Sequence, residues 1–344
     1  MNNKIVYRNI GLFVLLILFV LGCSGSEKTV SDQPDEDRGY ISSAGSELVR
    51  DQIKDSFESI KRIHNTVTYQ TYVFDPANYP TRQEVETLGP QALAIDTDTD
   101  SHSTAGTVTV LANHQRKTTF LTAAHVVSFA DTIWHRAENR NRVEAMSVKT
   151  SLVHFMFVDN GLHTLDVAIT DSRRDLALMV LDWTEESNPQ LEALSLQPGD
   201  HEELDWTDMV YALGYPRGFQ MVTRGMVSKF TTIPRRSFVI DAPFNRGFSG
   251  GLLFTVRRDG TGLNWVGMLS AAYAETEYFI SPGEINEDDY NPNVEYDGPL
   301  YMQRERRLNY GITYAIGMEE IGGFFRENSD AIRRLGLSVP DVPE

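Results

Sequence analysis

Residues 247–251 read Gly-Phe-Ser-Gly-Gly and place a serine among backbone positions that can turn sharply. A serine hydroxyl is a weak nucleophile unless a base takes its proton and N–H groups stabilise the charge that develops on the attacked oxygen. Glycine permits a tight turn that aims such N–H groups into one small space. Ser249 is therefore a candidate nucleophile, although the stretch also fits the Gly-x-Ser-x-Gly elbow of α/β-hydrolases.

The order of the histidines along the chain separates these two possibilities. A hydrolase elbow requires a histidine after its serine, whereas the alternative arrangement has the order His, Asp, Ser. All eight histidines lie between His64 and His201, so none follows Ser249. The elbow is thus excluded as a complete triad, and we expect the order His, Asp, Ser.

The surroundings of one histidine set it apart from the other seven. His125 lies near the end of residues 120–127, which read Phe-Leu-Thr-Ala-Ala-His-Val-Val. The small side chains before it leave room for a nucleophile from another segment to approach. We therefore predict that His125 is the base that activates Ser249.

The acid that orients the histidine should lie between His125 and Ser249. Asp175 comes directly before a run of six apolar residues, so its carboxylate can be held at the mouth of a buried strand and fix the imidazole tautomer. Asp166, in a strand-like stretch, and Asp171, in a turn, are the alternatives. We predict that Asp175 completes the triad.

Most of the chain consists of short β-prone runs separated by polar loops. The first set is Thr66–Phe74, Gly106–Leu111, Thr118–Leu121, Val143–Val148, Val153–Val158 and Leu176–Leu181. The second set is Met209–Leu213, Met226–Phe230, Ser237–Ile240, Leu252–Val256, Trp265–Leu269 and Tyr310–Ile316. Many short strands without helical periodicity between them predict an all-β fold. We expect two packed antiparallel β-barrels, over residues 66–190 and 191–316.

Helical periodicity appears only at the two ends of this body. Apolar residues between Leu48 and Ile63 recur at helical spacing, which predicts an N-terminal helix over residues 44–65. The apolar residues between Ile321 and Leu335 predict a C-terminal helix, followed by a tail, within residues 317–344.

The first residues have the composition of a signal peptide. Lys4 and Arg8 precede the apolar run 10–21, which only Gly11 interrupts. This run is short for a membrane-spanning helix, which needs about 20 residues. We predict that residues 1–22 are a signal peptide.

The residues that follow point to a lipid anchor. Residues 20–23 read Val-Leu-Gly-Cys and resemble the lipobox of bacterial lipoproteins, which implies that Cys23 is acylated. Cys23 is the only cysteine, so an internal disulfide is excluded. Residues 23–43 are mostly small or charged and predict a flexible tether. Ser24 follows the cysteine, at the position where an aspartate would signal retention in the inner membrane of many Gram-negative bacteria. We therefore expect the protein at the outer membrane, facing the periplasm.

The charge balance limits the possible partners. The chain has 31 Lys and Arg against 48 Asp and Glu, a net charge of −17, so binding to nucleic acid is not expected. Acyl chains rather than a basic patch would have to hold the protein at a membrane. Residues 96–100 and 284–297 are acidic but lack the glycine and final glutamate of a calcium loop. We expect solvated loops there, and neither a metal nor a cofactor.

Three ordered blocks resemble the active-site blocks of trypsin-like serine proteases, and more closely those of the bacterial HtrA/DegP branch. They are residues 122–125 (Thr-Ala-Ala-His), 175–178 (Asp-Leu-Ala-Leu) and 247–251. The similarity covers about 105 to 325, and further matches in the same order are 213–216, 225–228, Asp241–Ala242, Asn245 and 310–316. The resemblance implies a chymotrypsin-like double barrel, here without the PDZ domain of HtrA proteins.

The same resemblance implies roles for individual residues. Ser249 would be the nucleophile, His125 the general base and acid, and Asp175 the partner of the histidine. The N–H groups of Gly247 and Ser249 would form the oxyanion hole.

The substrate-binding residues follow from the resemblance in the same way. A peptide would lie beside the strand with Ser270 and Ala271, adding main-chain hydrogen bonds to it. Pro243 and Ala272 fall where the specificity pocket is expected, and neither is charged. We expect the residue before the cleaved bond to be apolar and of small or medium size.

Two hypotheses about function follow. The first is a serine endopeptidase that cleaves extracytoplasmic proteins through an acyl-enzyme. The second is a catalytically weak barrel that binds peptides or partners at the cell surface. Arg246 and Phe248 keep the second open, because they replace the proline and asparagine usual in HtrA-like proteins next to the oxyanion hole.

Overall fold

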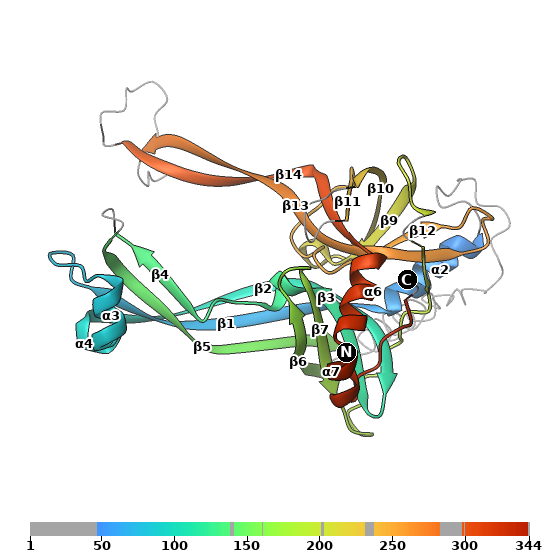
Figure 1. Ribbon diagram of the computed structural model, residues 1–344, viewed down its shortest axis with the longest axis horizontal. Helices are drawn as coiled ribbons and strands as arrows, with labels where there is room; N and C mark the ends of the chain where they lie inside the picture. Colours follow the sequence, from blue (N-terminus) through green and yellow to red (C-terminus); the bar gives the residue numbers. More distant parts are fainter. Residues whose placement is uncertain are drawn as a thin grey trace, which may run out of the picture. The chain divides into compact units, whose positions relative to one another are not determined.

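The computed structural model consists mainly of antiparallel strands arranged in two sheets (Figure 1). It describes residues 47–137, 141–159, 161–200, 203–230, 237–282, 298 and 300–342. The predicted signal peptide, Cys23, the tether and the acidic segment 284–297 lie outside these residues. Within the described ranges, no helix has both the length and the apolar character needed to cross a membrane.

The first sheet closes into a barrel of six strands. In order across the sheet, its strands are β1 (Ile60–Phe74), β2 (Ala94–His114), β3 (Lys117–Ala123), β7 (Leu176–Asp182), β6 (Gly161–Asp171) and β5 (Val143–Val158). Strand β1 also pairs with β5, and this pairing closes the barrel. A seventh strand, β4 (Thr132–Arg136), pairs with β5 but is not one of the six strands that close the barrel.

The second sheet follows the same plan. Its strands are, in order, β12 (Leu252–Val256), β9 (Met209–Gly214), β10 (Met221–Phe230), β11 (Phe238–Ile240), β14 (Leu300–Gly317) and β13 (Leu263–Pro282). Strand β13 also pairs with β12, and the short β8 (Gln197–Pro198) lies parallel to β13. The predicted all-β fold of two antiparallel barrels is confirmed.

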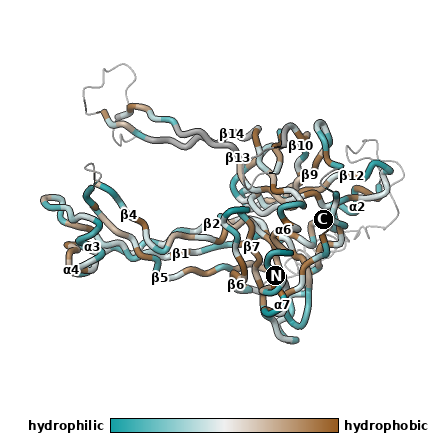
Figure 2. The backbone as a smooth tube through the Cα atoms, in the orientation of Figure 1, coloured by the Kyte–Doolittle hydropathy of each residue, from teal (hydrophilic) through white to brown (hydrophobic). Residues whose placement is uncertain are grey.

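A buried apolar cluster joins the two barrels. It contains Phe120 of β3, Trp265 of β13 and Phe324 of the helix α6 (Met318–Glu327), each at most 1% exposed. Burying a side chain of this size contributes about 2–3 kcal/mol relative to leaving it in water. Apolar residues accordingly concentrate in the barrel strands and in α6 (Figure 2). The short helix α7 (Ser329–Arg334) follows α6.

The N-terminal helix is shorter than its periodicity predicted. Helix α2 spans Glu47–Glu58, and the residues from Ile60 to 65, expected in the helix, belong to β1. Ile60 and Ile63 are three residues apart, which fits one face of a helix, but burial in β1 then alternates along the chain as a strand requires. Pairing with β2 and β5 therefore overrides the local helical spacing.

Strands β1, β2 and β5 are longer than predicted and form an extension of the first barrel. The acidic residues 96–100, expected in a solvated loop, form part of β2 and pair with Tyr69–Val73 of β1. Alternating threonines and the long partner strand explain why this polar stretch is extended. The helices α3 (Arg82–Leu88) and α4 (Pro90–Leu93) connect β1 to β2.

An arginine ties helix α6 to the turn between β6 and β7. The Arg174 guanidinium donates hydrogen bonds to Asp171, Glu320 and Glu327, and its side chain is only 10% exposed. Burial alone would raise the pKa of Asp171, but hydrogen bonds from Arg174 and Arg173 lower it overall. The hydrogen bond from Arg174 likewise lowers the pKa of Glu327.

We predict that Arg174→Met lowers the free energy of unfolding by about 1–2 kcal/mol at pH 7, because the Asp171 carboxylate, which is only 18% exposed, loses the donor of its side-chain hydrogen bond. Carboxyl groups whose pKa is lowered in the folded state stabilise the protein above their unfolded pKa, and this stabilisation is lost as the pH falls through the folded value. The difference between wild type and variant should therefore shrink below about pH 4. Denaturant unfolding at several pH values measures it.

The matched control is Arg333→Met, because Arg333 is 79% exposed and makes only a surface ion pair with Asp330. It should change the stability little at any pH. A pH-independent loss in Arg174→Met would contradict the electrostatic explanation.

Candidate active site

The pairing of β3 with β7 brings His125 and Asp175 together. Ala123 at the end of β3 lies opposite Leu176 at the start of β7. His125 follows in the short helix α5 (Ala124–Val127), and the Ala124 N–H donates to the carbonyl oxygen of Asp175 over 3.0 Å. The strand register thus positions two residues that are fifty apart in sequence.

The two ring nitrogens of His125 have different partners. Nδ1 donates to the Asp175 carboxylate, 2.8 Å from Oδ2 and 3.0 Å from Oδ1. Nε2 accepts from the Ser249 hydroxyl over 2.9 Å. The carboxylate fixes the tautomer with the proton on Nδ1, which leaves Nε2 free to act as a base toward Ser249. The structure therefore brings the three predicted triad residues together.

The Asp175 carboxylate is held by further donors. Its Oδ1 accepts from the N–H of His125 over 2.9 Å, and its Oδ2 accepts from the Ser270 hydroxyl over 2.7 Å. Burial alone would raise the pKa of Asp175, but the bonds and charge of His125 and the Ser270 hydroxyl lower it overall. The side chain is 15% exposed and stays ionised near neutral pH.

The turn before Ser249 has a backbone that requires glycine. Gly247 has φ +102°, and a side chain there would collide with the carbonyl oxygen of Tyr215. The Phe248 N–H donates to the Asn245 carbonyl over 3.1 Å, which closes a four-residue turn with glycine at its third position, as in type II.

The orientation of one peptide in this turn sets the direction of the Gly247 N–H. The Arg246 carbonyl accepts from the Arg217 N–H over 2.8 Å. Because the peptide is planar and trans, the Gly247 N–H points away from Arg217. Within the described residues no acceptor is found for the N–H groups of Gly247 or Ser249.

The first barrel holds the same turn from the other side. The Thr107 hydroxyl of β2 donates to the Gly247 carbonyl over 2.7 Å, and the Thr107 N–H donates to the Ser249 carbonyl over 2.9 Å. Phe248 is 1% exposed and packs against Phe244 in the core of the second barrel. Hydrogen bonds and apolar packing therefore fix the backbone around Ser249.

The other predicted site residues lie on two segments of the second barrel. Ser270, Ala271 and Ala272 follow one another on β13, and Ala272 is buried. Pro243 is exposed in the loop after β11. The contact of Ser270 with Asp175 was not foreseen, since no local pattern links residues that are 95 apart in sequence.

The alternative acids are engaged or placed elsewhere. The Asp171 carboxylate accepts from Arg174, and Asp166 lies within β6 opposite Val180.

Thr107 and Arg217, which orient the turn before Ser249, were not predicted from the sequence, because their contribution comes from contacts between distant segments. No group of three or more potential metal ligands occurs in the described part of the chain.

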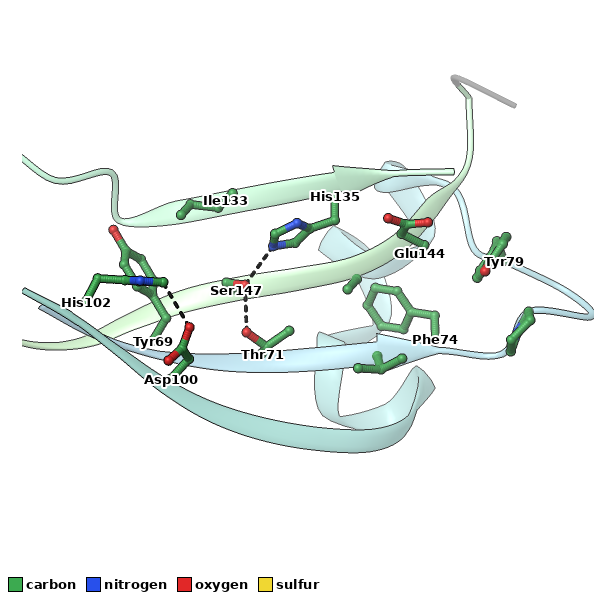
Figure 3. A pocket seen from close by; sticks show the side chains of 13 residues that line it. Tyr69, Thr71, Phe74, Tyr79, Asp100, His102, Ile133, His135, Glu144 and Ser147 are labelled. Carbon is green, nitrogen blue, oxygen red and sulfur yellow. Dashed lines mark hydrogen bonds and ion pairs between the residues drawn. The ribbon is translucent and has the colours of Figure 1, made fainter. Parts of the chain in front are cut away.

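A cavity of about 530 Å³ lies in the extension of the first barrel, apart from the triad (Figure 3). Tyr69, Phe74 and Glu144 are among its lining residues, and no triad residue is. His135 and Thr71 both bond to the Ser147 hydroxyl at its wall, over 2.8 and 2.7 Å. The chemistry of the site therefore rests on the triad geometry and not on this cavity.

Comparison with known proteins agrees with this geometry. Residues 106–263, which include His125, Asp175 and Ser249, match the family described as trypsin-like peptidase domain. The chain contains a trypsin-like peptidase domain.

Curated relatives of this domain are DegP-like proteins. Two "Probable periplasmic serine endoprotease DegP-like" proteins, from Pseudomonas putida strain F1 and Pseudomonas fluorescens Pf-5, are 33% and 31% identical over 150 residues. The match covers 42% of this chain and 26% of each relative, so the chain spans about a quarter of their length.

Solved structures of HtrA-type proteases are also similar. "HtrA-type protease AlgW with decapeptide" is 15% identical, with a TM-score of 0.45 over 85% of this chain and 76% of that chain. The same protease "with tripeptide" has a TM-score of 0.43 at 15% identity, over 84% and 64% of the two chains.

We predict that Ser270→Ala raises the pKa of Asp175, because the ionised carboxylate loses one of its hydrogen-bond donors. Carboxyl carbon NMR on protein labelled at aspartate measures this pKa directly. An unchanged or lower pKa would show that the Ser270 hydroxyl does not stabilise the charge.

Proposed function

We propose that this protein is a serine endopeptidase with His125, Asp175 and Ser249 as its catalytic triad. The observation that supports this most strongly is the position of Ser249 Oγ, 2.9 Å from His125 Nε2, while Asp175 occupies the other ring nitrogen. Nucleophile, base and orienting acid thus form one chain of hydrogen bonds.

The reaction follows from this arrangement. Ser249 Oγ attacks the peptide carbonyl carbon while His125 Nε2 takes the hydroxyl proton, giving a tetrahedral intermediate and an imidazolium that Asp175 stabilises. His125 then gives the proton to the leaving amine, and the C–N bond breaks to leave an acyl-enzyme on Ser249. Water, deprotonated by His125, attacks the ester, and collapse of the second intermediate returns the proton to Ser249 and releases the acid.

The turn before Ser249 supplies the N–H groups that would stabilise the negative charge of the tetrahedral intermediate. We assign the oxyanion hole to the N–H groups of Gly247 and Ser249, which lack acceptors among the described residues. The bond from Arg217 to the Arg246 carbonyl supports a hole that is already formed without substrate. This argues for an active enzyme over the weak peptide-binding barrel.

The substrate would bind beside β13. Its residues before the cleaved bond would add as a strand along Ser270 and Ala271, and the side chain at the cleaved bond would face Pro243 and Ala272. These uncharged positions favour an apolar residue of small or medium size. Cleavage after Lys, Arg or acidic residues in a peptide library would contradict this preference.

The location of the enzyme is proposed from the sequence and its relatives. The curated relatives are named as periplasmic endoproteases, and residues 20–23 resemble a lipobox. We propose that the mature chain is acylated at Cys23 and faces the periplasm from the outer membrane. Its substrates would then be extracytoplasmic proteins.

Reaction with a fluorophosphonate tests the catalytic assignment, because such probes react with an activated serine. The wild-type chain should be labelled, and Ser249→Ala should not. We expect Ser249→Ala and His125→Ala each to reduce kcat for a cleaved peptide by about 10⁴-fold or more. Circular dichroism confirms that each variant is folded.

The assignment as a protease would be wrong if the folded wild-type protein were not labelled and cleaved no peptide of the library. If that protein bound library peptides without cleaving them, the result would favour the second hypothesis, a catalytically weak barrel that binds peptides.

Fractionation of bacteria that express the full chain tests the anchor. We expect wild-type protein in the outer-membrane fraction and Cys23→Ser in the inner-membrane or soluble fractions, because acylation and the processing that depends on it require the thiol. Metabolic labelling with an alkyne fatty acid should mark the wild type alone. A membrane-bound, unlabelled wild type would contradict lipidation.

A further inference from the structure

Strands β13 and β14 continue beyond the second barrel as a two-stranded hairpin (Figure 1). The paired positions run from Tyr273 and Asn309 to Pro282 and Leu300. We call residues 273–282 and 300–309 the arm. A two-stranded hairpin alone is only marginally stable in water, so a further strand or surface would stabilise the arm.

One edge of the arm is unpaired in the described part of the chain. On this edge β13 pairs with β12 only from Leu263 to Met268, and Leu269 bonds to Gly250 and Gly251. From Ser270 to Pro282, no described strand adjoins β13 on the side away from β14. An open edge of this length can accept an extended chain through main-chain hydrogen bonds.

One face of the arm is apolar and exposed. Ile280 lies directly opposite Met302, and Tyr278 and Leu300 lie two residues away on the same face, since alternate residues of a strand share a face. Their exposed fractions are 65% for Tyr278, 68% for Ile280, 60% for Leu300 and 76% for Met302. We call these four residues the apolar face, and brown marks the far end of the hairpin in Figure 2.

The open edge begins at the catalytic site. Ser270, whose hydroxyl bonds to Asp175, is the first residue of this edge, and β13 continues from there into the arm, with irregularities in its pairing with β14 between Leu269 and Ala271 and between Ala272 and Tyr273. In the proposed function the residues before the cleaved bond lie along β13, and the catalytic site lies at the Ser270 end of this edge. The substrate residues that lie farther from Ser270 along β13, toward the arm, are therefore the residues farther toward the substrate's N-terminus.

We propose that the arm is a second binding surface for the substrate, which takes up the segment N-terminal to the cleaved bond as an added strand. This inference rests on the proposed function. The ten residues of β13 from 273 to 282 would pair with a segment about 30 Å long. The apolar face would select segments with apolar, β-prone side chains on one side, as unfolded protein exposes.

Charge argues against two other partners for the arm, a membrane surface and a second copy of the chain. Residues 283–299, which lie between the two arm strands in sequence, contain six acidic residues and no basic one. This charge would repel the anionic headgroups of a membrane. Each copy of the chain has a net charge of −17, so residues 283–299 of one copy would also repel the same residues of a second copy.

Three peptides that share one short cleaved sequence test the proposal. The first is the short peptide itself. The second has an N-terminal extension as long as residues 273–282 with alternating Val and Thr, and the third has the same extension at its C-terminus. We expect the N-terminal extension to raise kcat/KM about tenfold over the other two peptides.

Matched variants locate the effect on the arm. Ile280→Asp places a charge on the apolar face, and Ile95→Asp changes an equally exposed isoleucine, 62% exposed, in the first barrel. The advantage of the N-terminal extension should fall below about threefold in Ile280→Asp and persist in Ile95→Asp. All three proteins should cleave the short peptide equally.

A third variant removes the arm. Glu275 and Arg307 are direct partners, so Asn-Gly in place of residues 276–306 can close a short hairpin there. This variant should cleave the short peptide normally and lose the advantage of the extension. If this variant does not fold, the comparison of Ile280→Asp with Ile95→Asp still tests the proposal.

The outcomes separate this inference from the proposed function. Cleavage of the short peptide with no gain from the N-terminal extension overturns the inference alone, whereas no cleavage of any peptide overturns the proposed function. A dimer or binding to phosphatidylcholine vesicles that Ile280→Asp abolishes, without any gain from the extension, would assign the arm to a second copy or to a membrane.

Discussion

The structure around the site depends on how one largely buried negative charge is satisfied. Asp175 sits between the two barrels, and a carboxylate there is unfavourable unless donors surround it. The side chain and N–H of His125 come from the first barrel, and the Ser270 hydroxyl comes from the second. The same bonds that keep the acid ionised therefore hold His125 in one tautomer and fix β13 beside it.

The nucleophile depends on a second contact between the barrels. Thr107 of the first barrel binds the carbonyl groups on both sides of Phe248, while the Phe248 ring is buried in the second barrel. The anchor of this turn is an apolar ring, so no charged side chain is needed to hold the turn in place. A backbone fixed in this way has its N–H groups oriented before substrate arrives, which is the condition for electrostatic stabilisation of an oxyanion.

Both barrels extend strands beyond what a closed barrel requires, and the two extensions differ in chemistry. The extension of the first barrel pairs its polar strand β2 with β1 and has small helices and a buried core around Phe74. The arm of the second barrel has only two strands, an open edge and an exposed apolar face. The first extension has a small core of its own, whereas the arm has an open strand edge next to its exposed apolar face.

The sequence by itself determined the strand-rich fold class and the order His125, Asp175, Ser249. These inferences needed only apolar alternation, small residues around His125 and Ser249, and the lack of any histidine after the serine. The sequence did not reveal the helix end at Glu58 or the strand at residues 96–100, because pairing with distant strands outweighed local periodicity and polarity. The Ser270 contact, the Thr107 and Arg217 bonds and the direction of the Gly247 N–H were decided by tertiary structure. Each joins segments far apart in the chain, and such contacts depend on strand register and barrel packing, which leave no local pattern in sequence.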